Sequence, residues 1–243
     1  MIKKDKSKDE ETHPEQHGAN EAAKTNWLRA AVLGANDGIV SISGLVVGVA
    51  GAAASQSVIL AAGVAGVIAG ALSMAAGEYV SVSSQRDVEK ALLAKEAYEL
   101  KNFPEEELEE LKGIYKRKGL SDKTAALVAH ELTEHDPFKA HVEAELGIDP
   151  NNLTSPTHAA FASAASFTAG ALIPLIAIIL PPESIRIPVT FASVIFALII
   201  TGVLSAWVGK SDPVKATVRV VLGGVLAMVV TYAVGKIFHI SGI

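Results

Sequence analysis

Two long stretches of this chain contain no Asp, Glu, Lys or Arg, and they limit the possible folds more than any other feature. They cover residues 158–180 and 187–208. A mostly apolar run of about 18 or more residues can cross the hydrocarbon core of a bilayer, which is about 30 Å thick. Three further apolar runs contain at most three charged residues each. The sequence therefore predicts five transmembrane helices, at about 27–53, 57–84, 157–180, 187–209 and 214–237.

A charged segment, residues 86–156, separates the second expected helix from the third. No Pro or Gly occurs between residues 85 and 102. The second helix is therefore expected to continue beyond the bilayer to about Asn102. The residues after it are typical of helix starts and ends: Pro104, Gly119, Ser121, Pro137 and Gly147. The expected fold class is an all-α, polytopic membrane protein with a small helical domain inserted between helices two and three.

Lys and Arg gather on one side of the expected bundle, in the N-terminal arm, the insert and the 209–219 connection, whereas the opposite side has only Arg186 and Lys236. Basic loops stay in the cytoplasm, so we expect the N-terminus and the insert there and the C-terminus outside. The arm is polar and expected to be disordered. The expected parts are the arm 1–26, helices one and two in 27–85, the cytoplasmic domain 86–156, helices three to five in 157–238, and a tail 239–243.

Composition excludes several classes of function. The chain has no cysteine, which excludes disulfides, thiolate metal ligands and Fe–S clusters. Its formal net charge is −5, which gives no reason to expect nucleic acid as a partner. We also expect no enzyme activity, because the two enzyme signatures closest to this sequence fail. HELTEH at 130–135 spaces its histidines five apart rather than four, and a di-iron oxidase needs a pair of Glu-x-x-His motifs in a bundle, which the chain lacks.

Three residues in the first two helices could bind or pass an ion. Asp37 lies inside the first helix, and an ionisable side chain in a membrane marks an ion path or a proton relay by default. The alternative is that Asp37 lies near the interface and pairs with Arg29. Met74 and Glu78 are four apart on the second helix and share a face. A thioether with a carboxylate suits a first-row divalent cation better than Mg²⁺ or Ca²⁺.

The insert carries two pairs of glutamates spaced three apart, Glu96 with Glu99 and Glu107 with Glu110. Two antiparallel helices could bring all four together, an arrangement that is unfavourable without a cation because like charges oppose ionisation. The alternative is a solvated acidic face. His141 and Glu145, four apart, could add imidazole and carboxylate ligands. Small additional metal sites are predicted from the pairs His130 with Glu134 and Glu131 with His135.

Small residues recur at four-residue spacing in the first two helices, as in Gly34 with Gly38 and Gly44 with Gly48. Such faces let helix backbones approach closely in lipid. Two interpretations remain open at this point, namely packing within one chain and a dimer interface along the first helix.

These motifs resemble the vacuolar iron transporter family, in its bacterial branch. The resemblance is carried by NDGIVSISGL in the first helix, GALSMAAGEYVSVSSQ in the second, and the glutamate-rich insert, and it covers about residues 27–238. It implies a homodimer of five-helix protomers that meet through transmembrane helix one, with the ion path between the two first helices. The implied activity is Fe²⁺ export from the cytoplasm in exchange for protons, and the implied location is a bacterial plasma membrane.

The resemblance also implies roles for single residues. Asp37 matches the family's first-helix aspartate and Met74 its second-helix methionine. Glu96, Glu99, Glu107 and Glu110 match the four glutamates of its metal-binding domain, and Glu145 matches its last-helix glutamate. Two positions differ. Eukaryotic members have a membrane glutamate where this chain has Gly66, and we take Glu78 to replace it. The family's paired methionines are His141 and Val142 here, so the site should be harder.

The predicted function is therefore proton-coupled export of Fe²⁺, in which membrane carboxylates hold either protons or a cation and the insert captures metal. Mn²⁺ is the main rival cargo, and Co²⁺ and Zn²⁺ are further cations that such ligands accept. A membrane-anchored metal sensor without transport is the alternative function. Intramembrane carboxylates argue against it, because a sensor does not need them.

Overall fold

The computed structural model describes residues 19–151 and 153–240, without the side chains of 19–27, 29 and 240. The predicted arm therefore lies mostly outside the described residues, as do the last residues of the predicted tail and the side chain of Arg29. The first helix already begins at Ala19, inside the range that the sequence analysis assigns to the arm.

The described residues form helices and contain no strand, which confirms the all-α prediction. The helices are α1 (Ala19–Gly51), α2 (Gln56–Asn102), α3 (Pro104–Arg117), α4 (Asp122–His135), α5 (Pro137–His141), the π-helical turn η1 (Val142–Leu146), α6 (Pro156–Ile179), α7 (Arg186–Val208) and α8 (Pro213–Ile240).

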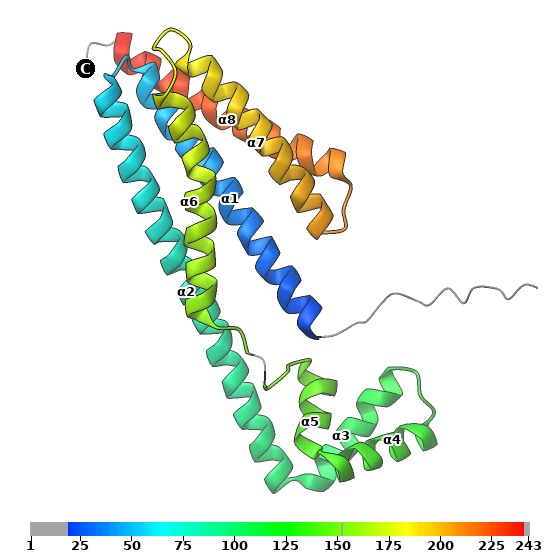
Figure 1. The fold of residues 1–243 in the computed structure, drawn as a ribbon. Coiled ribbons are helices and arrows are strands. Elements are labelled where there is room, and N and C mark those ends of the chain that lie inside the picture. Colours follow the sequence, from blue (N-terminus) through cyan, green and yellow to red (C-terminus); the bar gives the residue numbers. More distant parts are fainter. Residues whose placement is uncertain (1–18, 152, 241–243) are drawn as a thin grey trace, which may run out of the picture.

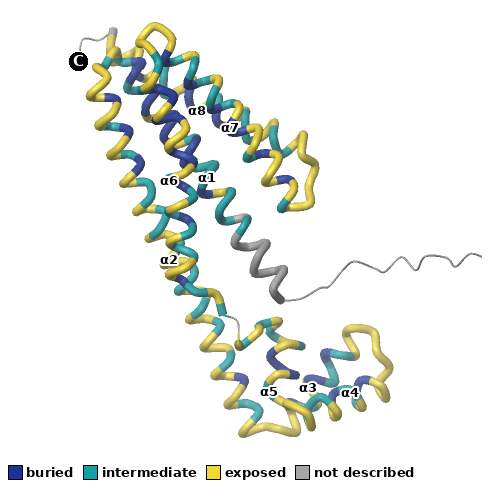
Figure 2. The backbone as a smooth tube through the Cα atoms, in the orientation of Figure 1, coloured by how far each residue is buried: buried dark blue, intermediate teal, exposed yellow. Residues whose placement is uncertain are grey.

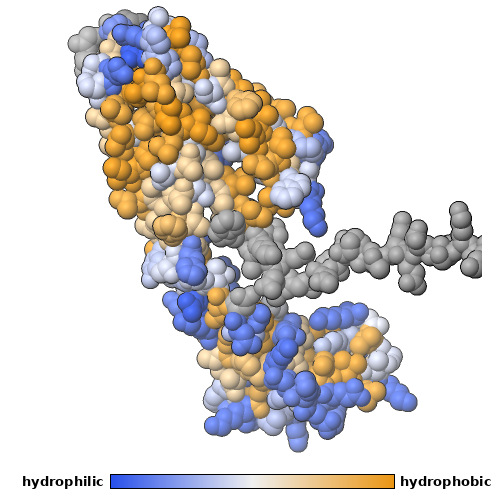
Figure 3. All heavy atoms as spheres, viewed as in Figure 1, coloured by the Kyte–Doolittle hydropathy of each residue, from blue (hydrophilic) through white to orange (hydrophobic). Residues whose placement is uncertain are grey.

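Five of these helices, α1, α2, α6, α7 and α8, are long and apolar enough to cross a membrane, which confirms the predicted number. The membrane-spanning parts of these helices begin within one turn of the expected starts, although α1 itself already begins at Ala19. Figure 3 shows the apolar surface gathered over this bundle, whereas the insert below it is mostly hydrophilic. The chain is a membrane protein with an elongated bundle and a smaller group of helices at one end (Figure 1).

Helix α2 is much longer than a membrane is thick. Its 47 residues extend about 70 Å at 1.5 Å per residue, whereas the hydrocarbon core is about 30 Å thick. The C-terminal half of α2 therefore stands outside the bundle and leads directly into α3 (Figure 1). This confirms that the second membrane helix continues to Asn102.

Helix α1 lies at the centre of the bundle and contacts each of the other four membrane helices. One side of it packs with α2 and α6 in a core that includes Ile42, Ile59 and Phe167. Its other side packs with α7 and α8 around Ile39 and Met228. In Figure 2 the buried stretches of the bundle lie where its helices face one another, whereas the outer faces are exposed in the protomer.

The small residues of α1 pack within the chain. A side chain at Gly38 would collide with the backbone of Phe167 in α6, and one at Gly170 of α6 would collide with the backbone of Ala35. Farther along α1, Gly48 faces Thr231 of α8. The glycine pattern of the first helix thus supports close packing inside one protomer, one of the two interpretations that the spacing left open.

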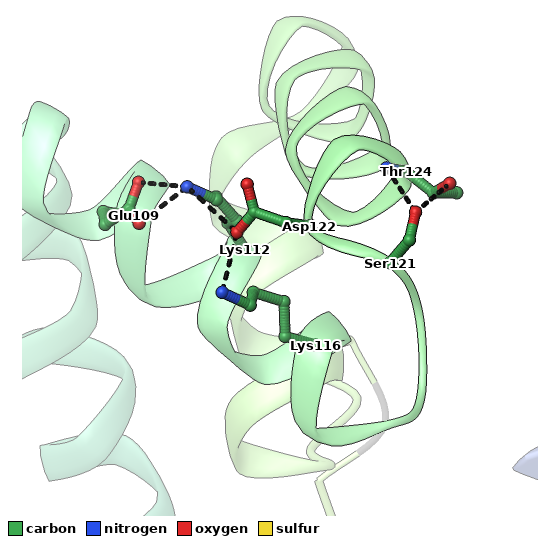
Figure 4. Close-up of polar contacts among 6 residues, drawn as sticks. All are labelled: Glu109, Lys112, Lys116, Ser121, Asp122 and Thr124. Atoms are coloured by element: carbon green, nitrogen blue, oxygen red, sulfur yellow. Dashed lines mark hydrogen bonds and ion pairs between the residues drawn. The ribbon is translucent and has the colours of Figure 1, made fainter.

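The insert has its own small core, formed by Leu111, Ala129 and Ala140. A charged clamp joins α3 to α4 (Figure 4). Lys116 Nζ lies 2.7 Å from Asp122 Oδ1, and Lys112 Nζ lies 3.8 Å from the same oxygen. The Lys116 hydrogen bond and the two positive charges lower the pKa of Asp122.

The α4 helix also has an N-cap. Ser121 accepts a hydrogen bond from the backbone N–H of Thr124, as the predicted cap requires. With the clamp, this cap fixes the corner between α3 and α4.

We predict opposite effects of the same substitution at two glycines. Gly170→Ala should lower the melting temperature in detergent, because its Cβ meets the α1 backbone and overpacking costs about 1–3 kcal/mol. Gly77→Ala is the control, because nothing lies near its Cβ position and alanine favours a helix by about 1 kcal/mol. Equal melting temperatures for the two variants would contradict the close approach of α1 and α6.

Candidate metal centre

Four potential metal ligands converge where the long helix meets the insert. Glu96 comes from α2, Glu107 from α3, His141 from the end of α5 and Glu145 from η1, and each offers a ligand atom within 4.8 Å of the others. Figure 1 shows α2, α3 and α5 meeting at this end of the molecule. Three carboxylates and one imidazole therefore share one small volume.

The centre is buried although it lies outside the membrane bundle. Glu96, Glu107 and His141 are 3 %, 7 % and 0 % exposed, whereas Glu145 reaches the surface. His141 Nδ1 lies 3.1 Å from Glu96 Oε1 and 3.4 Å from Glu107 Oε2. One side of the centre is thus closed by protein, and Glu145 stands on its open side.

The chain bend at Phe103 brings the first two ligands together. Phe103 ends α2 with its N–H bonded to the carbonyl of Glu99, and its own carbonyl accepts from the N–H of Glu107. Pro104 then suits the first turn of α3, since its missing N–H is not needed there. Because α3 turns back beside α2, Glu107 faces Glu96 across the bend.

A short capped helix and a π-helical turn supply the other two ligands. Asp136 accepts a hydrogen bond from the backbone N–H of Lys139 at 3.0 Å and so caps α5. The turn η1 follows, and it ends at Gly147, whose φ of 63° is favourable only for a residue without a side chain. π-Helical turns are rare and occur frequently at functional sites, and this one carries Glu145.

Burial and mutual repulsion keep protons on the centre. The pKa of Glu96 is raised to about 7, first by burial and then by the carboxylates of Glu145 and Glu107. Burial and the nearby Glu110 raise the pKa of both Glu107 and Glu145. Burial also lowers the pKa of the His141 imidazole, so this ring tends to be neutral.

Several buried polar atoms in the centre have no hydrogen-bond partner. They are Glu96 Oε1 and both ring nitrogens of His141. His141 Nδ1 and Glu96 Oε1 are close, but their orientation does not make a hydrogen bond. Buried polar groups without partners are costly, and a cation coordinated by the carboxylate and by one ring nitrogen would relieve both groups. Oxygen ligands with one imidazole and no sulfur suit Mn²⁺, Fe²⁺ or Zn²⁺.

Two of the predicted insert ligands lie at the rim of the centre. Glu99 is held by Lys95, whose Nζ lies 2.7 Å from its Oε2. Glu110 is exposed, and its charge acts on Glu107, His141 and Glu145. The structure therefore gathers four of the six predicted insert residues around one point and places Glu99 and Glu110 beside them.

The predicted additional sites on α4 are open. His130, Glu131, Glu134 and His135 are all exposed, and the shortest contact among them joins His130 Nδ1 to Glu134 Oε1 at 3.6 Å. Within residues 19–151 and 153–240, the centre described above is the only place where three or more such ligands meet.

The membrane candidates lie at different depths. Gly34 and Gly38 of α1 and Gly70 of α2 all face Phe167 of α6, so Asp37 and Gly70 share one level. Two turns beyond Gly70 toward the insert, Glu78 lies about 12 Å away along α2, and Met74 stands between these levels beside the core of α1, α2 and α6. The three residues therefore form a series of steps along the bundle.

Asp37 has one polar contact among the described residues, the hydroxyl of Ser41, which donates to Asp37 Oδ1 at 2.8 Å. The residue before it, Asn36, has a buried side-chain oxygen without a partner. The sequence analysis missed Asn36, because an amide beside an acid gives no pattern, and only burial distinguishes it.

The comparisons with known proteins identify the family. Residues 28–236 match the VIT family. The chain belongs to the VIT family. A protein named vacuolar iron transporter from Acanthamoeba castellanii is 42% identical over 210 residues, which are 86% of this chain and 77% of that protein.

Plant proteins are similar to this VIT-family chain as well. Vacuolar iron transporter homolog 1 of Oryza sativa subsp. japonica is 37% identical over 93% of this chain and 80% of its own length. Vacuolar iron transporter homolog 4 of Arabidopsis thaliana is 36% identical over 90% of this chain and 88% of its own length. These relatives come from an amoeba and from plants, so the bacterial branch stays a prediction.

We predict that metal binding strengthens with pH until Glu96 is ionised. Metal must displace the proton that Glu96 holds below its pKa of about 7, so each displaced proton should raise affinity about tenfold per pH unit below that value. Calorimetric titration of the detergent-solubilised protein with Mn²⁺ at about pH 6, 7 and 8 measures this. The gain should be larger over the first interval, and an affinity independent of pH would contradict it.

We also predict that Glu96→Gln stabilises the metal-free protein. A carboxyl with a raised pKa favours folding most at low pH, and this stability is lost as pH rises from about 4.5 through about 7. At about pH 8 the free energy of unfolding of the variant should therefore exceed that of the native protein by about 1–3 kcal/mol, and the variant should melt at a higher temperature. At about pH 4.5 the two proteins should differ little.

The same variant should lose the stabilisation that Mn²⁺ gives the native protein, because it lacks one ligand. Glu109→Gln is the matched control, since Glu109 is exposed and pairs with Lys112 at 2.8 Å. It should keep the Mn²⁺ effect. A Glu96→Gln protein that is less stable without metal would show that the carboxylate has a structural role instead.

Proposed function

We propose that this VIT-family protein exports Fe²⁺ from the cytoplasm in exchange for protons. The observation that carries the proposal is the continuity of α2, which holds Met74 and Glu78 in its membrane half and Glu96 in the buried centre at its other end. The names of the relatives, which are iron transporters or their homologs, support iron as the cargo.

The centre in the insert acts as the capture site. It offers three carboxylates and an imidazole at one point, so it can bind a cation from a dilute pool. The proton held by Glu96 leaves when metal binds, because a carboxylate ligand must be ionised. The exposed Glu110 gives the rim a negative charge that attracts the cation, whereas the charge of Glu99 is balanced by Lys95.

The exposed stripe of α1 supports a homodimer through this helix. Leu33, Ser41 and Leu45 are exposed in the protomer, and Asp37 lies among them at four-residue spacing, partly exposed. An acid on a lipid-facing surface is costly, whereas a second copy of α1 would cover it. The ion path then runs between the two first helices, with the Asp37 side chains facing each other.

In this path, Glu78, Met74 and Asp37 act in sequence from the insert side. Glu78 does not stand at the depth of Gly66, which lies twelve residues earlier on α2 and faces Leu45. It serves as an entry step rather than as part of the deepest site. The membrane carboxylates bind either a proton or the cation, and their alternate exposure to the two sides couples the two flows.

The proposed orientation places the N-terminus and the domain 86–156 in the cytoplasm and the C-terminus outside. The basic 209–219 connection lies at the same end of the bundle as the insert, in agreement with the positive-inside rule (Figure 1). We propose a bacterial plasma membrane as the location, on the motifs of the first two helices.

Mn²⁺ is the closest alternative cargo. The insert centre has no sulfur ligand, and one thioether in the membrane discriminates weakly among first-row divalent cations. Co²⁺ and Zn²⁺ are expected to bind as well, since imidazole and carboxylate suit them.

Flux in proteoliposomes tests the function, and we predict that Asp37→Asn abolishes it. Fe²⁺ and Mn²⁺ uptake are measured with and without a pH gradient, together with proton movement. The native protein should couple the two flows, whereas Asp37→Asn should lower the rate at least about tenfold by removing a carboxylate from the path. The insert of the Asp37→Asn variant should still bind Mn²⁺ with the native affinity.

The control is Asp87→Asn, because Asp87 is exposed on the part of α2 outside the bundle, and this variant should transport normally. Transport by Asp37→Asn at the native rate would exclude the proposed path. No flux of either ion by the native protein, with intact metal binding, would favour a metal sensor.

A further inference from the structure

A crevice opens where α7 ends and α8 begins, against the start of α1. Its volume is about 640 Å³, and its lining includes Leu28, Val203, Ala206, Trp207, Lys210 and Ser211. The connection between α7 and α8, which contributes to this lining, lies at the end of the bundle that faces the insert (Figure 1). None of these residues belongs to the metal centre or to the path through Asp37.

The walls of the crevice are apolar. Leu28 comes from α1, Val203 and Ala206 come from α7, and Ala206 is buried at 2 % exposure. Trp207 in the last turn of α7 is 75 % exposed, as is common for aromatic residues at the boundary between membrane and water. Because Val203 and Ala206 lie in the last turns of a membrane span, the acyl chain of a lipid can reach these walls.

The mouth of the crevice is positively charged. Lys210 is the charged residue of its lining. Arg219 follows on α8 and is exposed, whereas Lys215 Nζ lies 3.8 Å from Asp212 Oδ2. The only carboxylate nearby in sequence, Asp212, accepts hydrogen bonds from the backbone N–H groups of Val214 and Lys215 and so caps α8. Across the described part of the chain, neither Lys210 nor Arg219 has a carboxylate partner.

The backbone at Lys210 has an unusual conformation. Its φ is 47°, in the left-handed region where a residue with a side chain is strained. Glycine would relax this position, yet the chain has a lysine there, between the apolar wall and Ser211. This conformation holds a cation at the mouth, where the ends of the two helices meet.

We propose that the crevice binds an anionic phospholipid. The phosphate lies at Lys210 and Ser211, and an acyl chain follows the wall formed by Val203 and Trp207. The volume falls within the range of small-molecule sites, about 300–1,000 Å³. Basic pockets between membrane helices bind acidic headgroups, and the apolar walls require a ligand with a hydrocarbon chain rather than free phosphate.

Thermal unfolding of the full chain in detergent tests this proposal with three probes. Dioleoylphosphatidylglycerol should raise the melting temperature in a saturable way. Dioleoylphosphatidylcholine, which has no net charge, and glycerol 3-phosphate, which has no acyl chain, should not. An equal effect of the phosphatidylcholine would exclude charge recognition, and an equal effect of glycerol 3-phosphate would show a phosphate site instead of a lipid site.

Matched variants locate the effect. Lys210→Gln should lose most of the shift caused by phosphatidylglycerol, whereas Lys236→Gln, the same change at the other end of α8, should keep it. Lys210→Gly removes the charge and also relaxes the backbone, so it should fold at least as well as the native chain and still lose the shift. If the three variants all keep the native shift, or all lose it equally, the proposed crevice is not the site.

Discussion

The uninterrupted backbone hydrogen bonding of α2 links the membrane bundle to the insert, because it makes α2 a single rod that extends from one to the other. A membrane helix that ended at the bilayer surface would leave the insert on a flexible connection. Here the helix keeps its register over 47 residues, so Met74, Glu78 and Glu96 have fixed relative positions. Only at Phe103 does the chain bend, and that bend closes the metal centre.

The metal centre shows how stability and binding oppose each other. Three carboxylates near a neutral imidazole are unfavourable when buried without a cation, and the raised pKa values of Glu96, Glu107 and Glu145 express this cost. A core chosen for stability alone would have apolar residues at these positions. The same repulsion is the reason why we expect the centre to release protons when a cation enters, and why we predict that its metal affinity depends on pH.

Much of the fold could be predicted from the sequence, because membrane spans depend on length and hydropathy, both of which are local. The helix breaks of the insert were also visible, since Pro104, Ser121 and Gly147 act within one turn. The site was only partly predictable. The i, i+3 spacing suggested equal roles for Glu96 and Glu99, whereas burial depends on how α2, α3 and η1 pack, and this packing buries Glu96 but leaves Glu99 partly exposed.

Long-range packing also showed that small residues of α1 lie against α6 and α8 within the chain, and it revealed Asn36 and the crevice at Lys210.

The insert makes its substantial contacts with the membrane part through α2 alone, since α3, α5 and η1 contact α2 but no other membrane helix to that extent. The chain leaves the bundle along α2 and re-enters through α6 on the same side. The packing of the five membrane helices against one another therefore does not depend on residues 104–146, so substitutions in the insert can leave the bundle unchanged. A change of cargo preference could thus arise in the insert while the five-helix bundle stays as it is.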